Sequence, residues 1–355
     1  MPFTPKERER YSRQMLLPEF GEHGQERLKA ARILIVGAGG LGSPAALYLA
    51  AMGVGSIGII DDDYVAASNL HRQILYREAD IGRQKAALAG ERLSEINGSA
   101  NIQIYTERLN DENVLDVLRD SDLVLDGSDN FATRYLVNDA CLVLGIPLIS
   151  ASILRFEGQL SVLCAEDGPC YRCLFPEPPS AAQAPSCAEA GVIGALAGVM
   201  ATMMAMEAVK LIAKIGESFA GRLLLYDALA GNFRTIRVER DSNCSACSVP
   251  HGRRKLAESY EMDTCLIDVP EISWKDYGRT PMPLIDVREE WEFYGQPSKG
   301  KLIPMGSLAE RIAELPHEKF GIVCASGIRS LEAASMLRQK GFDAVSIRGG
   351  MNAIE

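Results

Sequence analysis

The sequence lacks an excess of basic residues, an export signal and an apolar run long enough to cross a membrane. The formal net charge is −10, whereas general nucleic-acid binders usually present a basic face. Residues 1–8 are polar and charged, so we expect no secretory signal and a cytoplasmic location. The most apolar run, 191–206, stops at Glu207, short of the roughly 20 residues that span a bilayer. We therefore expect a buried helix there, and neither nucleic acid nor membrane as a partner.

The composition is that of an ordinary soluble protein, with 47% hydrophobic and 24% charged residues. A length of 355 residues suggests about two domains. We place the first at 1–250, a charged linker at 251–262 and a smaller domain at 263–355. In the first domain apolar strands alternate with helices, which predicts an α/β fold with an open, mostly parallel, Rossmann-like sheet. The second domain reads as a smaller α/β unit.

Residues 31–61 read as strand, glycine-rich turn, helix and a second strand ending at Asp61. The turn, 37–42, fits the pattern G-x-G-x-x-G at Gly37, Gly39 and Gly42. A side chain at Gly39 or Gly40 would keep a phosphate from the backbone, and the following helix offers free N–H groups to an anion. Asp61 lies where an acid that binds ribose is expected. The alternative, a glycine turn chosen only for tight packing, fits this context less well.

Polar residues then follow the ends of neighbouring strands, where ligands of such sheets bind. Arg72 and Lys85 would bind phosphates, Asn69 would be a polar anchor, and Asp129 is a hard oxygen ligand suited to Mg²⁺. Taken singly, each is an ordinary surface residue. Together they favour a nucleoside triphosphate over a dinucleotide, which needs fewer cations and no metal-binding acid.

The nine cysteines of a chain without an export signal suggest metal or catalytic use. Two C-x-x-C pairs, Cys170/Cys173 and Cys244/Cys247, fit a closed tetrahedral zinc site, whose metal would be structural. The competing hypothesis is a pair of redox dithiols, but neither pair opens a helix in a thioredoxin-like unit.

Two further cysteines have distinctive surroundings. Cys187 precedes a helix, where a thiol can become a thiolate, although a small buried hydrophobe is an equally good interpretation. Cys324 follows a strand, and its loop curls into a helix through Gly327, Arg329 and Ser330. Converging backbone N–H groups and Arg329 would stabilise a thiolate or persulfide there.

With these residues in place, the chain resembles a MoeB/ThiF-type adenylyltransferase fused to a C-terminal rhodanese domain, the molybdopterin-synthase adenylyltransferase/sulfurtransferase family. The resemblance covers nearly the whole chain and rests on a combination of motifs. They are Arg10-Tyr-Ser-Arg-Gln14, Gly37–Gly42, Ser68-Asn-Leu-His-Arg72, Lys85, Asp129-Asn130, Cys170-Tyr-Arg-Cys173, Ser186-Cys187, Cys244/Cys247, Asp286-Val-Arg288 and Cys324–Ser330. After Gly349-Gly350 the chain departs from the family pattern, which commonly continues through a tryptophan and a final helix.

The resemblance implies that Mg-ATP adenylates the C-terminal glycine of a ubiquitin-like sulfur carrier ending in Gly-Gly. A persulfide on Cys324, loaded by a sulfur donor, would then give a thiocarboxylate. Arg13 matches an arginine that reaches the ATP site of the other subunit, which implies a homodimer, and Cys187 matches a cysteine that links covalently to the carrier in some members. The implied nucleotide-binding residues are Gly37, Gly39, Gly40, Gly42, Asp61, Ser68, Asn69, Leu70, His71, Arg72, Lys85, Asp129 and Asn130.

Three other functions compete. The glycine motif alone would allow an NAD-dependent oxidoreductase, which leaves Lys85, Asp129 and the Cys324 loop without a role. A scaffold could bind a ubiquitin-like partner without catalysis. An activating enzyme could pass the carrier on as a thioester without sulfur transfer.

Overall fold

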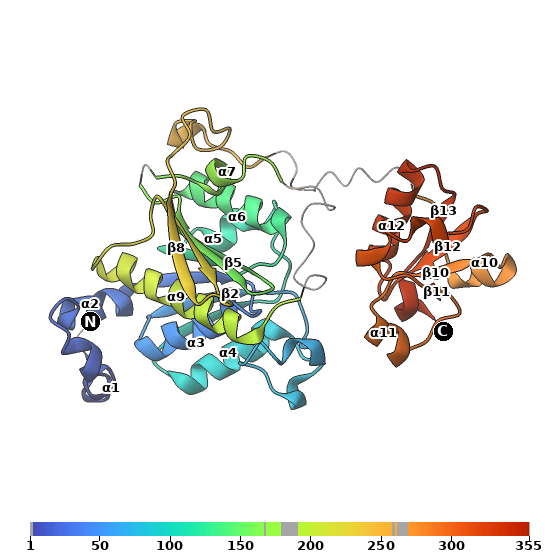
Figure 1. Ribbon diagram of the computed structural model, residues 1–355. Helices are drawn as coiled ribbons and strands as arrows, with labels where there is room; N and C mark the ends of the chain where they lie inside the picture. The colour runs from blue at the N-terminus through green and yellow to red at the C-terminus, as the bar shows by residue number, and fades with distance from the viewer. Residues whose placement is uncertain (1–2, 167, 179–190, 258–259, 261–268, 355) are drawn as a thin grey trace. The chain divides into compact units, whose positions relative to one another are not determined.

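The computed structural model describes residues 3–166, 168–178, 191–257, 260 and 269–354 (Figure 1). The chain divides into two compact units, Met1–Met262 and Asp263–Glu355. Each unit has a sheet of its own.

The sheet of the first unit has strand order β3-β2-β1-β4-β5-β6-β7-β8. The first five strands in chain order pair in parallel, and β6, β7 and β8 continue the sheet as antiparallel strands. The predicted open, mostly parallel α/β sheet is confirmed. The strands are β1 (Arg32–Val36), β2 (Ser56–Ile60), β3 (Asn101–Tyr105), β4 (Leu123–Asp126), β5 (Leu148–Leu154), β6 (Glu157–Leu163), β7 (Arg222–Asp227) and β8 (Asn232–Arg237).

Helices cover both faces of this sheet because successive residues of a strand point to opposite sides. In β1, Ile33 and Ile35 face one core, whereas Leu34 and Val36 face the other. The first core is covered by α2 (Gly21–Ala30), α3 (Gly42–Met52), α4 (Lys85–Ile96) and α9 (Gly194–Ala213). The second is covered by α5 (Val114–Leu118), α6 (Phe131–Leu144) and α7 (Tyr171–Leu174).

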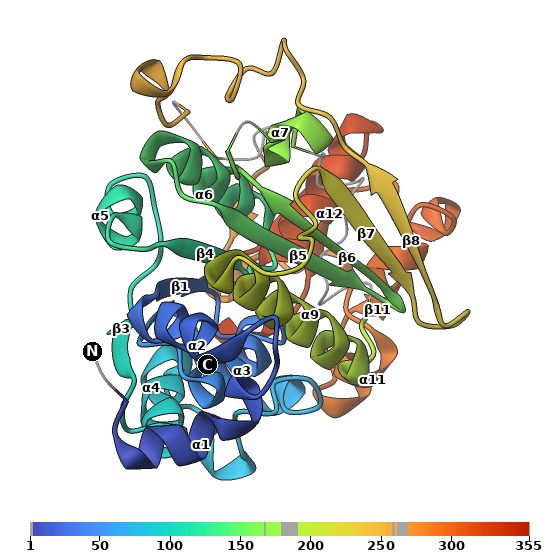
Figure 2. The same ribbon diagram turned by 90° about the vertical axis from the view of Figure 1, so that its left-hand side faces the viewer.

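Among the described residues, α9 is the one helix with the length and apolar composition to span a bilayer, and half of its apolar window is buried. It packs across β5 and β6 beside α2 and α3 (Figure 2). The helix continues past the apolar run to Ala213, and it includes Glu207, whose side chain is buried. The Glu207 carboxylate accepts a hydrogen bond from the Phe219 amide and pairs with Lys210. The expected buried helix is confirmed.

In the second unit a parallel sheet has strand order β11-β10-β12-β13-β9. Its strands are β9 (Glu271–Ile272), β10 (Leu284–Asp286), β11 (Lys301–Leu302), β12 (Phe320–Val323) and β13 (Ala344–Ile347), and its helices are α10 (Trp274–Arg279), α11 (Glu290–Gly295) and α12 (Ile328–Gln339). Trp274 donates its indole N–H to the Gly350 carbonyl at 2.7 Å. An indole from the start of the unit thus binds the turn at Gly350.

Candidate active sites and metal centre

The glycine turn lies where the strand order reverses, between β1 and β4. The Gly37 amide donates to the Ile60 carbonyl of β2, and the Gly127 amide donates to the Val36 carbonyl of β1. Gly37 has φ +87°, a conformation that favours glycine. A Cβ on Gly42 would lie 1.8 Å from the Gly37 carbonyl oxygen. The fold itself therefore requires Gly37 and Gly42.

Gly39 and Gly40 are different, because the protein itself leaves room for a side chain at both. A Cβ on Gly39 would meet only the Gln73 amide nitrogen at 3.6 Å, and one on Gly40 would lie 3.4 Å from the nearest atom, the Ala197 Cβ. Packing thus does not explain these two glycines. They leave the backbone open at the N-terminus of α3, as an anion-binding turn requires. This cradle, which a Cβ would fill, fits a phosphate ligand.

Asp61 and Tyr76 hold the glycine turn through hydrogen bonds to the backbone of Ala38. The Asp61 carboxylate accepts hydrogen bonds from the Ala38 amide at 2.7 Å and the Asp63 amide at 2.8 Å. Burial raises the pKa of Asp61, and the positive charge of Lys85 opposes that shift. The buried Tyr76 hydroxyl is 2.8 Å from the Ala38 carbonyl oxygen and 3.2 Å from the Lys85 carbonyl oxygen, which links the turn to α4.

Arg72 lies beside the cradle: its Cγ would be 3.5 Å from a Cβ on Gly40. Its guanidinium donates to the Ser68 carbonyl at 2.9 Å and lies 2.9 Å from His71 Nε2. Partial burial and the charge of Arg72 lower the pKa of His71. The Asn69 side chain accepts a hydrogen bond from the Ala66 amide at 3.1 Å and so closes the turn that carries these residues.

Lys85 begins α4 and is almost fully buried. Its ammonium lies 2.6 Å from Asp63 Oδ2, and its amide donates to the Asp63 carbonyl at 2.9 Å. The loop after β2 and the start of α4 are thereby held together, next to the aspartate that binds the turn.

Asp129 is exposed, and within the described part of the chain no side chain or backbone group binds its carboxylate. Hydrogen bonds from neighbouring residues fix the loop that carries it. Buried Asp126 accepts hydrogen bonds from the Ser128 amide and hydroxyl at 3.0 and 2.6 Å, and Arg134 pairs with Asp126 at 3.7 Å. Asn130 caps α6 by accepting from the Thr133 amide at 2.9 Å. The loop, whose backbone is held by these hydrogen bonds, therefore presents an unbound carboxylate, which fits a hard cation such as Mg²⁺.

Arg13 is exposed and does not reach the glycine turn of its own chain. It lies in α1 (Pro5–Met15), next to Gln14, whose side chain binds the Met52 carbonyl at 3.1 Å. Met52 ends α3, whereas the glycine turn begins it, and an 11-residue helix is about 16 Å long.

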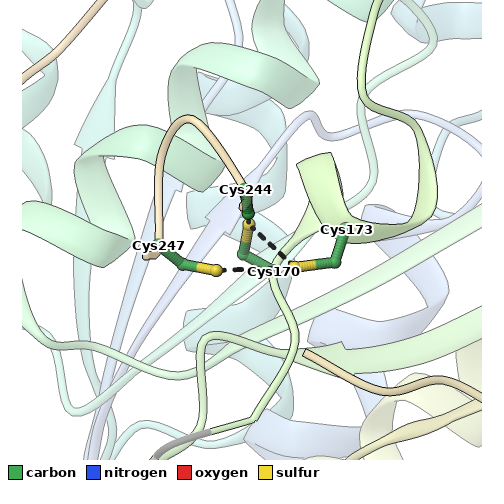
Figure 3. A group of neighbouring side chains, drawn as sticks. All are labelled: Cys170, Cys173, Cys244 and Cys247. Carbon is green, nitrogen blue, oxygen red and sulfur yellow. Dashed lines mark hydrogen bonds between the residues drawn. The ribbon is translucent and has the colours of Figure 1, made fainter. Parts of the chain in front are cut away.

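Four cysteine sulfurs converge from the two C-x-x-C pairs (Figure 3). Cys170 Sγ lies 3.8 Å from Cys173 Sγ and 3.6 Å from Cys244 Sγ, and Cys173 Sγ lies 3.4 Å from Cys247 Sγ. All four ligand atoms lie within 4.8 Å of one another. Zinc–sulfur bonds of about 2.3 Å separate tetrahedral sulfurs by about 3.8 Å. The arrangement therefore fits a zinc ion.

The protonation of these thiols also suits a metal. A hydrogen bond with the Cys170 thiol lowers the pKa of Cys173 to about 4, assisted by the Asp241 amide. The same hydrogen bond raises the pKa of Cys170. Burial raises the pKa of Cys247 to about 11. The hydrogen bonds to the Cys173 sulfur therefore favour its thiolate, the form of cysteine that binds metals.

Cys324 follows β12 in the second unit and is fully buried. Its sulfur accepts a hydrogen bond from the Gly327 amide at 3.1 Å, and its thiol lies 3.6 Å from Ser330 Oγ, which also binds the Gly327 carbonyl at 3.0 Å. Gly327 has φ +97° and precedes α12. The predicted loop around the cysteine, with backbone donation to sulfur, is present.

Arg329 is held by another partner. Its guanidinium binds the Glu292 carboxylate of α11 through both nitrogens, at 2.7 and 2.6 Å. The contribution of Arg329 to a thiolate or persulfide therefore stays a prediction. Cys187 lies outside the described residues, so its predicted role stays a prediction as well.

The sequence pattern of the ThiF family matches residues 11–246. The chain belongs to the ThiF family. The match covers the glycine turn, the residues around it and three of the four cysteines of the metal centre, and it ends one residue before Cys247.

Relatives of this ThiF-family protein extend the comparison. A Thermus thermophilus protein named "Sulfur carrier protein adenylyltransferase" is 50% identical over 263 residues, 73% of this chain and 97% of the relative. A Mycobacterium tuberculosis protein named "Probable adenylyltransferase/sulfurtransferase MoeZ" is 43% identical over 362 residues, 97% of this chain and 92% of the relative. At this identity over both units, the ThiF-family chain is an adenylyltransferase and a sulfurtransferase. The crystal structure of Escherichia coli MccB with MccA-N7isoASN shares the fold, with a TM-score of 0.61, 23% identity and coverage of 67% of this chain and 74% of MccB.

Sequence reasoning missed several residues that position these sites. Each of them binds a residue or loop that the sequence did single out: they are Tyr76, Asp63, Arg134 and Glu292. The first two lie between predicted site residues, so proximity in the chain was a usable signal. Arg134 and Glu292 act through contacts that form only in the folded chain.

Proposed function

We propose that the protein adenylates the C-terminal carboxylate of a ubiquitin-like sulfur carrier ending in Gly-Gly and then replaces the adenylate by sulfur from a persulfide on Cys324. What supports this most is that one chain carries both an open glycine cradle and a cysteine loop. The carrier is inferred from the Thermus relative, whose name includes a sulfur carrier protein.

In the first step the carrier carboxylate attacks the α-phosphate of ATP, and pyrophosphate leaves. A carboxylate is a poor acyl donor, and adenylation gives it a leaving group. Arg72, whose Cγ lies beside Gly40, and Lys85 would compensate the charge on the phosphates. Lys85, which binds Asp63 in the free protein, would exchange this carboxylate for a phosphate group. The enzyme mainly positions the reactants and balances charge.

Asp129 would hold Mg²⁺ through its free carboxylate, and the metal would supply further positive charge to the phosphates. Asp61 would accept a hydrogen bond from the ribose of ATP while it continues to hold the Ala38 amide with its other oxygen. The exposed carboxylate of Asp129 and the bond between Asp61 and the Ala38 amide support these two roles.

In the second step the terminal sulfur of the Cys324 persulfide attacks the acyl-adenylate, and AMP leaves. The product is an acyl disulfide between carrier and enzyme. Attack by a second thiol on the Cys324 sulfur then releases the carrier thiocarboxylate and leaves a disulfide. Cys187 would be that thiol, or an intermediate acceptor of the carrier. The persulfide comes from an external donor.

The four-cysteine centre would hold a structural zinc ion. It has no open coordination position, and its sulfurs come from two segments far apart in sequence, so the metal would fasten them together. Arg13 would act in the ATP site of a partner subunit in a homodimer, because it lies at the wrong end of α3 for its own site. A cytoplasmic location fits the free cysteines.

The direct test is ATP–pyrophosphate exchange with candidate carriers, each compared with a copy that lacks its last glycine. We expect exchange only with the intact Gly-Gly end. Hydride transfer to NAD⁺ without exchange would favour an oxidoreductase instead. Carrier binding without AMP formation, unchanged in Asp129→Ala, would favour a non-catalytic scaffold.

A further inference from the structure

Tyr260 ends the part of the first unit that the structure describes, and its hydroxyl is hydrogen-bonded on both sides. It donates to Asp139 Oδ2 at 3.0 Å and accepts from the Ala257 amide at 2.8 Å. Its ring packs against the core that α5, α6 and α7 cover. The sequence predicted a linker over 251–262, yet this tyrosine is bound to the first unit.

Asp139 is a buried residue of α6, and both oxygens of its carboxylate accept hydrogen bonds. Oδ1 accepts from Asn138 Nδ2 at 2.9 Å and from Arg172 Nε at 3.0 Å, and Oδ2 accepts from Arg172 Nη2 at 2.8 Å beside the tyrosine hydroxyl. Hydrogen bonds to an ionised acceptor are the stronger kind. The contact with Tyr260 is therefore more than a surface polar contact.

Arg172 connects this carboxylate to the metal centre, because it lies between two of the four cysteines, Cys170 and Cys173. Its guanidinium also stacks over the Tyr135 ring, 4.7 Å from the centroid. Its geometry is thus fixed by a ring on one side and by a two-point bond to Asp139 on another. We call Cys170–Cys173 with this arginine the knuckle.

A second contact holds the same segment a few residues earlier. Arg254 donates to the Val249 carbonyl at 3.1 Å, the Leu142 carbonyl at 3.3 Å and the Cys247 carbonyl at 3.5 Å. Leu142 lies in α6, as Asp139 does. The chain leaving the metal centre is therefore fastened twice along one helix, first by Arg254 and then by Tyr260.

We propose that Tyr260 is a positioning residue that anchors the start of the tether between the two units to the knuckle, through Asp139 and Arg172. The first unit then holds the chain as far as Tyr260, and not only as far as the last metal-binding cysteine. The physical part of this proposal, the anchor, needs no assumption about the reaction.

Its consequence rests on the proposed function, because the tether must bring Cys324 to the adenylate. The effective concentration of a tethered group falls roughly as the −3/2 power of the tether length once the tether can span the distance. Releasing the anchor moves the last fixed point of the first unit back along the chain, so we expect sulfur transfer within one chain to slow by about twofold, with adenylation unchanged.

Trypsin tests the anchor itself. Residues 256–274 contain no lysine or arginine, so trypsin can separate the units only at Arg253, Arg254 or Lys255 in this region. Tyr260→Phe keeps the ring and removes only the hydroxyl. Because cleavage follows the population of the open segment, losing a hydrogen bond to a carboxylate should speed it by about tenfold.

Two further variants make the result specific. Tyr277→Phe is the matched control, because it removes a tyrosine hydroxyl that binds the Met282 carbonyl within the second unit at 3.0 Å; we expect the wild-type rate. Arg172→Lys keeps the charge but loses the two-point bond, so we expect faster cleavage and little further effect of Tyr260→Phe on top of it.

Cleavage of Tyr260→Phe within twofold of wild type, or full additivity with Arg172→Lys, would overturn the anchor. The thiocarboxylate assay is read separately. If no variant forms thiocarboxylate, the proposed function fails, and the trypsin result still decides the anchor. If Tyr260→Phe is cleaved faster but transfers sulfur at the wild-type rate, the tether consequence is wrong.

Discussion

Lys85 is buried against Asp63, with its ammonium 2.6 Å from a carboxylate oxygen of that residue. The two partners differ in exposure: the lysine side chain is 6% exposed and the aspartate side chain is 71% exposed. A buried ammonium needs a partner, and an exposed carboxylate can give up that partner at little cost. The lysine can therefore exchange this carboxylate for a phosphate group.

Replacing this lysine should remove activation of the carrier without unfolding the protein. In Lys85→Met we expect carrier-dependent ATP–pyrophosphate exchange to fall by about a hundredfold or more, because the charge on the phosphates loses a preorganised cation. Arg83→Met is the control, since Arg83 lies on the same loop and binds Glu91 at the surface. If exchange in Lys85→Met stays within a fewfold of wild type, the lysine does not act in the reaction.

Alanine substitutions at two glycines of the turn should affect different properties: Gly42→Ala should lower stability, and Gly39→Ala should weaken ATP binding. Gly42→Ala places a Cβ 1.8 Å from the Gly37 carbonyl oxygen, so we expect a lower melting temperature and a loss of about 3 kcal/mol or more in unfolding free energy. Gly39→Ala meets no atom closer than 3.6 Å, so stability should hold while ATP binding weakens by about 1–3 kcal/mol. Calorimetry of unfolding and of ATP binding measures both. Unchanged ATP affinity in Gly39→Ala would mean that the cradle holds no phosphate.

The metal centre predicts one zinc ion per chain. Cys244→Ser should lose the metal and about 3 kcal/mol or more of unfolding free energy, because metal binding to such a site is coupled to folding. Elemental analysis and thermal unfolding measure the two effects. Cys141→Ala is the control, since this buried thiol lies outside the cluster. Full zinc content in Cys244→Ser would rule out the four-cysteine site.

Arg13 offers a test of action between subunits. Arg13→Ala and Lys85→Met should each be inactive in exchange, whereas co-refolded mixtures should recover about a quarter of wild-type activity, because half of randomly formed dimers carry one intact composite site. No recovery from dimers that demonstrably exchange subunits would show that the arginine does not act in trans.

A single substitution should remove sulfur transfer and leave adenylation intact. Cys324→Ala should keep wild-type pyrophosphate exchange, since the residue lies in the second unit, and should lose thiocarboxylate formation. Wild-type thiocarboxylate yield with a persulfide donor present would favour the thioester-passing activator instead.

The sequence was most informative where function needs an unusual local pattern. The glycine turn, the C-x-x-C pairs and the loop after Cys324 combine rare residues at fixed spacing, and each was recognised with its neighbouring strand and helix. The helix at 194–213 was predicted as buried, but nothing local to Glu207 indicates that the Phe219 amide and Lys210 accommodate its charge.

The sequence was least informative about pairs of residues that meet only in the folded chain. The Arg329 guanidinium was expected to stabilise the Cys324 sulfur, yet it binds the carboxylate of Glu292, 37 positions earlier. Tyr260 was assigned to a linker on composition, because its partner Asp139 lies 121 positions away. Spacing rules describe neighbours along one element and carry no information on such contacts.

The most direct measurement is mass spectrometry of an intact Gly-Gly carrier after incubation with the full chain, Mg-ATP and a persulfide donor. The account predicts replacement of oxygen by sulfur at the terminal carboxylate, dependent on ATP, on Lys85 and on Cys324. A carrier that is adenylated but never gains sulfur, whatever donor is supplied, would contradict it.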